Sequence, residues 1–275
     1  MTRYNFHTHS QFDDGKEPLE NYVAASIEKG LDALGFSAHV PLPLDNQWSL
    51  PAKDFPDYVA EVKKLKEQYK DQIKLFLGLE IDYIPGVSED FEGWMKNTPL
   101  DYCIGSVHLV REPESGKFWF IDGPAEGYFK GVEEVFGGDI RKAVTTFYQQ
   151  SIQMVKTQPL HIIGHMDKVK MHNKEKLFRQ SESWYVELID SLLKAIKEKG
   201  VIIELNTRGV YTGKTTEYFP SPFVLERCLH FGIPVMVNTD AHHPSQLDSH
   251  FDEGVTLLKD IGFKKMTTPF FEVEI

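Results

Sequence analysis

The sequence predicts an α/β fold of the TIM-barrel type. Short apolar runs alternate with amphipathic helical patterns, most runs end in a histidine or an acidic residue, and no Gly-rich phosphate loop follows the first run. Alternating strands and helices imply parallel strands joined by right-handed crossovers. Seven or eight such units in 275 residues fit a TIM-like barrel that occupies residues 1–275 as a single domain. An open doubly wound sheet is the alternative, and it usually carries the Gly-rich loop that is missing here.

Each predicted strand is a short apolar run that begins after a turn or a helix stop. His7 and His9 follow the first strand, and residues two apart in a strand point to the same side. A further edge strand is expected at residues 270–273. The seven main strands are predicted at residues 4–6, 33–37, 73–79, 102–107, 161–164, 201–205 and 234–238.

The predicted helices have recognisable starts and stops. Gly30 and Gly200 stop two of them, Asp139 caps a third, and Pro222 stands at the first position of a fourth. The segment of residues 111–138 is rich in glycine and aromatic residues, and we expect an active-site loop region there. The helices are predicted at residues 17–29, 53–69, 139–157, 183–199, 221–230 and 246–261, with a helix or loop from residue 88.

Composition excludes several classes of protein. A formal net charge of −11 argues against a general nucleic-acid or anionic-membrane binder, whose surface is basic. No apolar run is long enough to span a membrane, and the N-terminus lacks the pattern of a secretory signal. Cys103 and Cys228 are too few for a disulfide framework and fit reduced thiols in the cytoplasm. Nothing in the sequence specifies an oligomeric state.

The metal-capable residues lie at predicted strand ends. In a parallel barrel the carboxyl ends of all strands meet on one face, so residues far apart in the sequence would share one pocket. Asp14, in the segment Asp13-Asp14-Gly15, also suits an ordinary turn. The candidates are His7, His9, Asp14, His39, Glu80, His108, His165, Asp240 and His242.

The donor set indicates more than one metal ion. Imidazole and carboxylate ligands without thiolate suit zinc, iron or manganese. Nine ligands at three or four per ion, with one shared carboxylate, imply two to three divalent ions. Glu80 is the expected bridge, because a carboxylate has two oxygens whereas a neutral imidazole has one free lone pair.

These segments resemble the motifs of the polymerase and histidinol phosphatase (PHP) family over almost the whole chain. The length and the segments around His108 and His165 are most similar to its histidinol-phosphate phosphatase branch. The motifs are His7-Thr8-His9 with Asp14-Gly15, Ser37-Ala38-His39, Gly78-Leu79-Glu80, Gly105-Ser106-Val107-His108, Gly164-His165-Met166-Asp167 and Thr239-Asp240-Ala241-His242.

The resemblance implies a distorted (β/α)7 barrel with a trinuclear metal centre. One ion would be held by His7, His9, Glu80 and Asp240, and a second by Glu80, His108 and His165. The third would be held by Asp14, His39 and His242. Some family members have a histidine near Asp14, so this chain departs from the family there.

The resemblance implies hydrolysis of a small phosphorylated substrate, L-histidinol phosphate, in histidine biosynthesis. A hydroxide bridging two ions would attack phosphorus in line, and Asp240 or His242 would protonate the leaving alkoxide. One alternative is a phosphotyrosine-protein phosphatase, nucleotide phosphatase or exonuclease on the same scaffold. Another, of a different class, is a non-catalytic metal-binding PHP module.

Positive side chains near the strand ends are candidates for binding the phosphate. Arg208 follows the sixth strand on the same face, and its guanidinium could grip two phosphate oxygens, although a surface loop position is the alternative. Lys170, five residues after His165, is the second candidate. Asp122 suits a turn, or a contact with a substrate cation.

Overall fold

The computed structural model describes residues 1–275 and contains one sheet of seven parallel strands. The strand order is β1-β2-β3-β4-β7-β8-β9, so every neighbour in the sheet is also the next parallel strand along the chain. The α/β prediction is confirmed, and all seven main strands lie where the apolar runs placed them. Their bounds are β1 (Tyr4–Asn5), β2 (Ala33–His39), β3 (Lys74–Asp82), β4 (Tyr102–Ser106), β7 (Ile162–Ile163), β8 (Ile202–Asn206) and β9 (Val235–Asn238).

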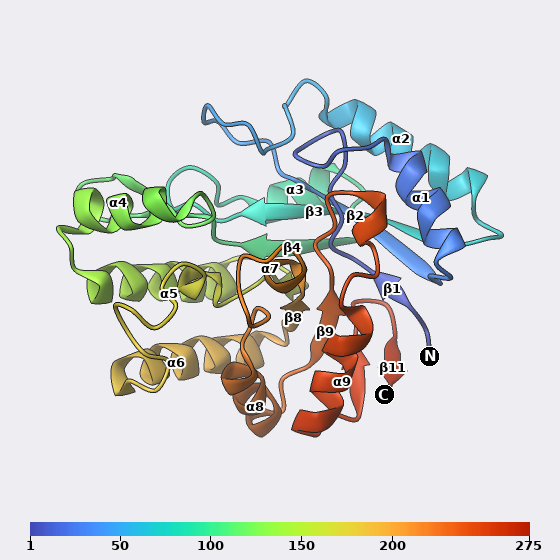
Figure 1. Ribbon diagram of the computed structural model, residues 1–275. Coiled ribbons are helices and arrows are strands. Elements are labelled where there is room, and N and C mark those ends of the chain that lie inside the picture. The colour runs from blue at the N-terminus through green and yellow to red at the C-terminus, as the bar shows by residue number, and fades with distance from the viewer.

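Helices connect the strands and pack outside the sheet (Figure 1). The Asp139 side chain accepts a hydrogen bond from Lys142 N, and Gly200 ends the α6 helix in the left-handed conformation, as the sequence predicts. No helix is long and apolar enough to cross a membrane. The helices are α1 (Leu19–Glu28), α2 (Phe55–Gln68), α3 (Phe91–Asn97), α4 (Ala125–Phe136), α5 (Ile140–Thr157), α6 (Ser183–Lys199), α7 (Arg208–Tyr211), α8 (Pro222–Phe231) and α9 (Phe251–Ile261).

Side chains complete the barrel where β1 meets β9. An isolated parallel bridge joins Thr8 to Ala241, and Phe6 N donates to the side-chain oxygen of Asn238 at 2.9 Å. Asn5 extends this contact, since its amide nitrogen lies 2.9 Å from Thr239 Oγ1. One backbone bridge and a seam of buried amide and hydroxyl groups stand here in place of a continuous backbone ladder.

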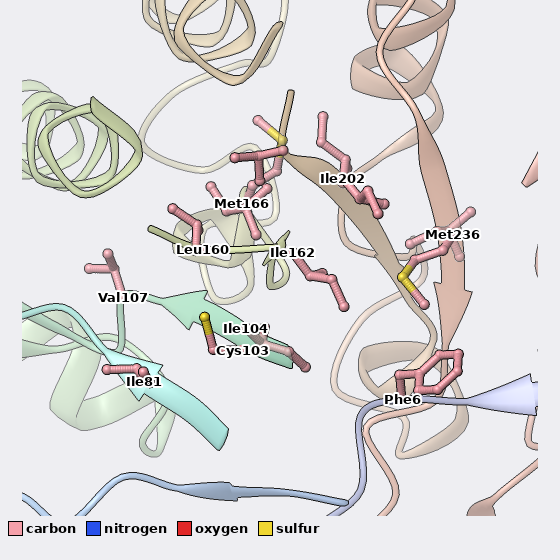
Figure 2. Packing of buried hydrophobic residues seen from close by; sticks show 14 of the residues in the cluster. Phe6, Ile81, Cys103, Ile104, Val107, Leu160, Ile162, Met166, Ile202 and Met236 are labelled. Atoms are coloured by element: carbon pink, nitrogen blue, oxygen red, sulfur yellow. The ribbon is translucent and has the colours of Figure 1, made fainter. Parts of the chain in front are cut away.

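The barrel interior is filled by apolar side chains from neighbouring strands, including Phe6, Ile104, Ile162 and Met236 (Figure 2). Tyr102 crosses this interior, and its hydroxyl donates to Phe6 O at 2.7 Å. Such filling is the rule for eight-stranded barrels, whose interior is a packed core and not a pore. Functional groups are therefore restricted to the open face above this core.

Three details differ from the prediction. Residues 111–138 are more regular than expected: they contribute to a hairpin of β5 (Leu109–Arg111) and β6 (Phe118–Phe120), and then form the α4 helix. A 3₁₀ helix at residues 244–246 and a turn at residues 247–250 precede the last helix, which starts only after His250 because that residue has φ 58° and cannot be part of an α-helix. The chain end pairs β10 (Lys265–Thr267) with β11 (Glu272–Glu274) in a separate antiparallel hairpin and is not an edge of the main sheet.

Candidate metal centre

All nine side chains that the sequence singles out as metal ligands lie together at the carboxyl ends of the strands. Eight of them are buried, and Asp14 is partly buried. Each comes from a different loop or strand end, except that His7, His9 and Asp14 share the loop after β1 and that Asp240 and His242 share the loop after β9. The parallel barrel therefore does what the sequence predicts: it brings residues 7 to 242 into one pocket.

Glu80 stands at the centre of this array, with one oxygen facing three imidazoles. Its Oε2 lies 3.1 Å from His7 Nε2, 3.4 Å from His9 Nε2 and 3.4 Å from His39 Nδ1. Asp240 Oδ1 approaches the same two nitrogens of His7 and His9, at 3.7 and 3.5 Å. One ion among these groups would have two imidazole and two carboxylate donors, which suits zinc, iron or manganese.

The other oxygen of Glu80 faces a second pair of imidazoles. Its Oε1 lies 3.1 Å from His165 Nε2 and 3.8 Å from His108 Nε2, and these two nitrogens are 3.2 Å apart. Two imidazole nitrogens that lie this close to each other and to a carboxylate oxygen form an arrangement that a cation would stabilise. The two oxygens of Glu80 thus face two separate groups of donors, as a bridging ligand requires.

A third group of donors lies between Asp14 and His242. Asp14 Oδ1 is 3.0 Å from His242 Nε2, and these two residues form a potential metal-binding group with His9. His39 belongs geometrically to two other groups, one with His9 and Glu80 and one with Asp82 and His108. The distribution of the ligands among individual ions remains a prediction.

Three carboxylates that sequence reasoning did not select hold the imidazole rings in place. His7 Nδ1 lies 2.6 Å from Glu204, His9 Nδ1 2.5 Å from Asp13, and His108 Nδ1 2.5 Å from Asp82. A carboxylate on Nδ1 fixes the proton there and leaves Nε2 free to bind a cation.

One signal for these partners was present in the sequence. Glu204 lies inside the apolar run Val201–Leu205, and Asp82 lies two residues after Glu80 on the same strand. A carboxylate inside a buried strand needs a partner, because burying an unpaired charge is expensive. This signal indicates that such residues have a partner, but it does not identify which residue the partner is.

One direct observation shows that these residues suit metal ions. Several of the candidate ligand atoms are buried and have no hydrogen-bond partner. They are His9 Nε2, His39 Nδ1, Asp14 Oδ1 and Asp240 Oδ1. Buried polar atoms are nearly always paired in folded proteins, so four unpaired atoms in one cluster indicate a binding place for a further group. Because the unpaired atoms are imidazole and carboxylate atoms only, a cation satisfies all of them.

The pKa values of these side chains in the protein without ions also favour a bound cation. Burial lowers the pKa of His7, but Glu204, Asp240 and Glu80 outweigh it and raise that pKa to about 10. Burial raises the pKa of Glu80, but the neighbouring His7 and His39 outweigh burial and hold that pKa well below its usual range. His165 behaves differently, because burial lowers its pKa to about 4 and leaves a neutral ring ready to ligate. The carboxylates therefore require positive charge in the pocket.

Two of the candidate ligands lie on strained backbone. His165 has φ 22° and Asp240 has φ 53°, although neither is glycine. Such conformations cost of the order of 1–3 kcal/mol each and concentrate at functional sites. The strain at the ends of β7 and β9 therefore supports a functional role for these two positions.

The donor residues line a cavity of about 190 Å³ that positively charged side chains also line. Arg208 lines it, and its Nη1 donates to Asp240 O at 2.9 Å. Lys168 and Lys214 line it too, and both pair with Asp122, at 2.7 and 3.6 Å. The cavity therefore combines a metal-binding floor with a positively charged side, an arrangement that suits an anionic substrate.

Lys170, the second sequence candidate for phosphate binding, lies outside the residues that line this cavity. Its Nζ pairs with Asp167 at 3.1 Å and Glu217 at 3.0 Å, and it lines a separate cavity of about 510 Å³. Lys168, two residues earlier, lines the metal cavity instead, because the chain turns into the short 3₁₀ helix η1 (Lys168–Lys170) directly after the ligand His165.

Comparison with known proteins gives consistent results. The profile of the PHP domain matches residues 5–208. A probable histidinol-phosphatase of Deinococcus radiodurans is 26% identical over 90% of this chain and 88% of its own length. The histidinol-phosphatase of Bacillus subtilis is 27% identical over 88% of this chain and 94% of its own length.

A solved structure shares the fold. It is a histidinol phosphate phosphatase of Lactococcus lactis in complex with zinc, L-histidinol and phosphate. The two chains align over 99% of each, with a TM-score of 0.73 and 22% sequence identity. The likeness confirms the distorted TIM-like barrel.

Proposed function

The chain belongs to the PHP domain family, and on that premise we propose that it is a metal-dependent phosphomonoesterase that hydrolyses L-histidinol phosphate to L-histidinol and phosphate. The curated relatives that match along most of their length carry the name histidinol-phosphatase, which supports this substrate. The reaction belongs to histidine biosynthesis, and we place it in the cytoplasm, in keeping with the two free cysteines Cys103 and Cys228.

The observation that carries the proposal is the position of Glu80 between two groups of imidazoles, beside a cationic wall. Two to three divalent ions held here would lower the pKa of water and neutralise phosphoryl oxygens. A non-catalytic metal-binding module would have no use for Arg208 and Lys168 at the same cavity. The arrangement therefore favours an enzyme that acts on phosphate esters.

Each group of this chain has a proposed part in the reaction. We assign His7, His9, Glu80 and Asp240 to one ion and Glu80, His108 and His165 to a second, as the distances around Glu80 support. Asp14, His39 and His242 are assigned to the third.

Arg208 and Lys168 are placed to hold the phosphoryl oxygens. The guanidinium offers a planar fork of donors, and one of its nitrogens is already fixed by the Asp240 carbonyl. Burial lowers the pKa of Lys168, but Asp122 outweighs it and raises that pKa, so the ammonium stays charged. Asp240 or His242, which lie beside Arg208 in the cavity, would take up the proton that the attacking water releases and pass it to the leaving alkoxide.

Steady-state kinetics with a panel of phosphomonoesters tests the proposal. L-histidinol phosphate is expected to have the highest kcat/KM, and nucleotides and phosphotyrosine peptides to be slower by at least about 10-fold, a difference that pocket contacts commonly supply. A preference of that size for phosphotyrosine peptides would instead assign the chain to the protein-phosphatase alternative. Preference for nucleotide or oligonucleotide substrates would favour the nuclease alternative.

A further inference from the structure

The metal cavity has two chemically different sides. Arg208, Lys168 and Lys214, which follow β7 and β8, supply the positive side. Trp48 and Phe120 are the aromatic residues that line the cavity, and they come from the loop after β2 and from β6. A phosphate ester held by the cations would therefore have an aromatic surface available for its organic part.

The two aromatic rings form one preformed surface. Trp48 and Phe120 are stacked, with ring centroids 5.0 Å apart and planes within 13° of parallel. The Asn46 side-chain oxygen fixes the loop under Trp48 by accepting from Trp48 N at 3.1 Å and Ser49 N at 2.8 Å. Phe120 is fixed by pairing with Leu109 in the hairpin. A surface held in this way loses little conformational freedom when a ring binds against it.

The indole nitrogen of Trp48 is an independent sign of a missing partner. Trp48 Nε1 is buried and has no hydrogen-bond acceptor in the protein. Two other tryptophans donate normally: Trp119 Nε1 to Tyr128 O at 3.0 Å, and Trp184 Nε1 to Glu182 at 2.7 Å. Buried indole N–H groups usually find an acceptor, so this N–H of a cavity-lining residue lacks a partner that the protein itself does not supply.

Asp122 does not compete for the organic part of the substrate. Its carboxylate pairs with Lys168 and Lys214, so its charge is already compensated. It lies two residues after Phe120, at the junction between the aromatic and cationic sides. Asp122 therefore positions the ammonium groups of Lys168 and Lys214, and the aromatic pair remains to contact the ring of the substrate.

We propose that Trp48 and Phe120 form a subsite for the planar ring of the leaving alcohol, with the Trp48 indole N–H donating to a ring nitrogen. This inference rests on the proposed function and names the residues that select its substrate. A neutral imidazole has one nitrogen acceptor and a flat apolar face, which match the donor and the stacked surface. An aliphatic phosphate ester has neither feature and gains nothing from this side of the cavity.

The test compares a substrate with a ring and one without. L-histidinol phosphate and O-phosphoethanolamine share an amino-alcohol phosphate, and only the first carries the imidazole. We expect Trp48→Ala and Phe120→Ala to lower the ratio of their kcat/KM values by roughly 10-fold or more, mainly through KM. Trp48→Phe, which keeps a ring but removes the N–H, is expected to lower the ratio by a smaller factor.

Phe118 provides a matched control. It lies on the same strand β6 as Phe120, both side chains are 37% exposed, and Phe118 does not line the cavity. Phe118→Ala is expected to keep the wild-type ratio. A calorimetric titration with L-histidinol supplies a second readout, in which Trp48→Phe and Phe120→Leu should bind more weakly while they retain the wild-type metal content and melting temperature.

The outcomes separate this inference from the function on which it rests. A wild-type enzyme that prefers O-phosphoethanolamine contradicts the proposed function, and the inference falls with it. A wild-type preference for L-histidinol phosphate that survives in Trp48→Ala and Phe120→Ala overturns the inference alone. Equal loss on both substrates would also overturn it, because the aromatic pair would then act on the cavity as a whole.

Discussion

Glu80→Gln is expected to lose bound metal and to lower kcat/KM by more than about 1,000-fold, since groups that only orient ligands already cost about 10- to 100-fold. The two oxygens of Glu80 face His7, His9 and His39 on one side and His108 and His165 on the other. Glutamine preserves the shape but removes the charge and replaces one oxygen by a donor. Both groups of ligands are therefore weakened by one substitution.

Elemental analysis and a phosphatase assay on the same sample measure this effect. Glu112→Gln is the matched control, because Glu112 is buried at 2% exposure, against 1% for Glu80, but pairs with Ser115 and Lys142 and does not line the metal cavity. It should keep its metal and its activity. Normal metal content and activity in Glu80→Gln would show that this carboxylate is not the bridge.

Arg208→Ala is expected to lower kcat by about 100- to 1,000-fold, which corresponds to about 2.7–4 kcal/mol for a donor to a transition-state oxygen. The guanidinium lines the cavity, and only its Nη1 is engaged by the Asp240 carbonyl and the Tyr211 hydroxyl, at 2.9 and 3.4 Å. Its remaining donors are free for the phosphoryl group. Lysine at this position should recover part of the rate, because a point charge cannot form the two parallel bonds.

The metal content of the Arg208 variants distinguishes a loss of phosphate binding from a loss of metal. It should stay near wild type, since Arg208 touches Asp240 through the backbone carbonyl and not through the carboxylate. Arg227→Ala removes a positive charge outside the site, where Arg227 pairs with Asp190, and should leave kcat unchanged. Full kcat/KM in a folded and metallated Arg208→Ala enzyme would rule out the phosphate clamp.

The barrel and the convergence of its candidate metal ligands were predictable because both follow from local patterns. An apolar run such as Val235–Asn238 between helical segments specifies a parallel strand, and parallel strands place their ends on one face. The histidine or carboxylate that follows each run then needs no further information to be placed in a common pocket. This logic located His7, Glu80 and His165 without knowledge of any contact.

Groups whose role depends on tertiary contacts were not predictable in the same way. In the sequence, Glu204 is one polar residue in an apolar strand. Only the folded barrel shows that it lies 2.6 Å from His7, which is 197 positions away. Lys168 and Lys170 differ by two positions, and only the turn after His165 decides which of them reaches the cavity. The stack of Trp48 on Phe120 joins the irregular loop after β2 to the short strand β6, which the sequence did not predict.

Metal stoichiometry correlated with activity tests the central claim most directly. The chain should be stripped with a chelator, titrated with zinc, iron or manganese, and assayed with L-histidinol phosphate at each point. Hydrolysis is expected to be absent from the stripped protein and to return fully at two to three equivalents of metal, because the donors around Glu80 are arranged for more than one ion. Full activity with less than one equivalent bound would contradict the multinuclear site.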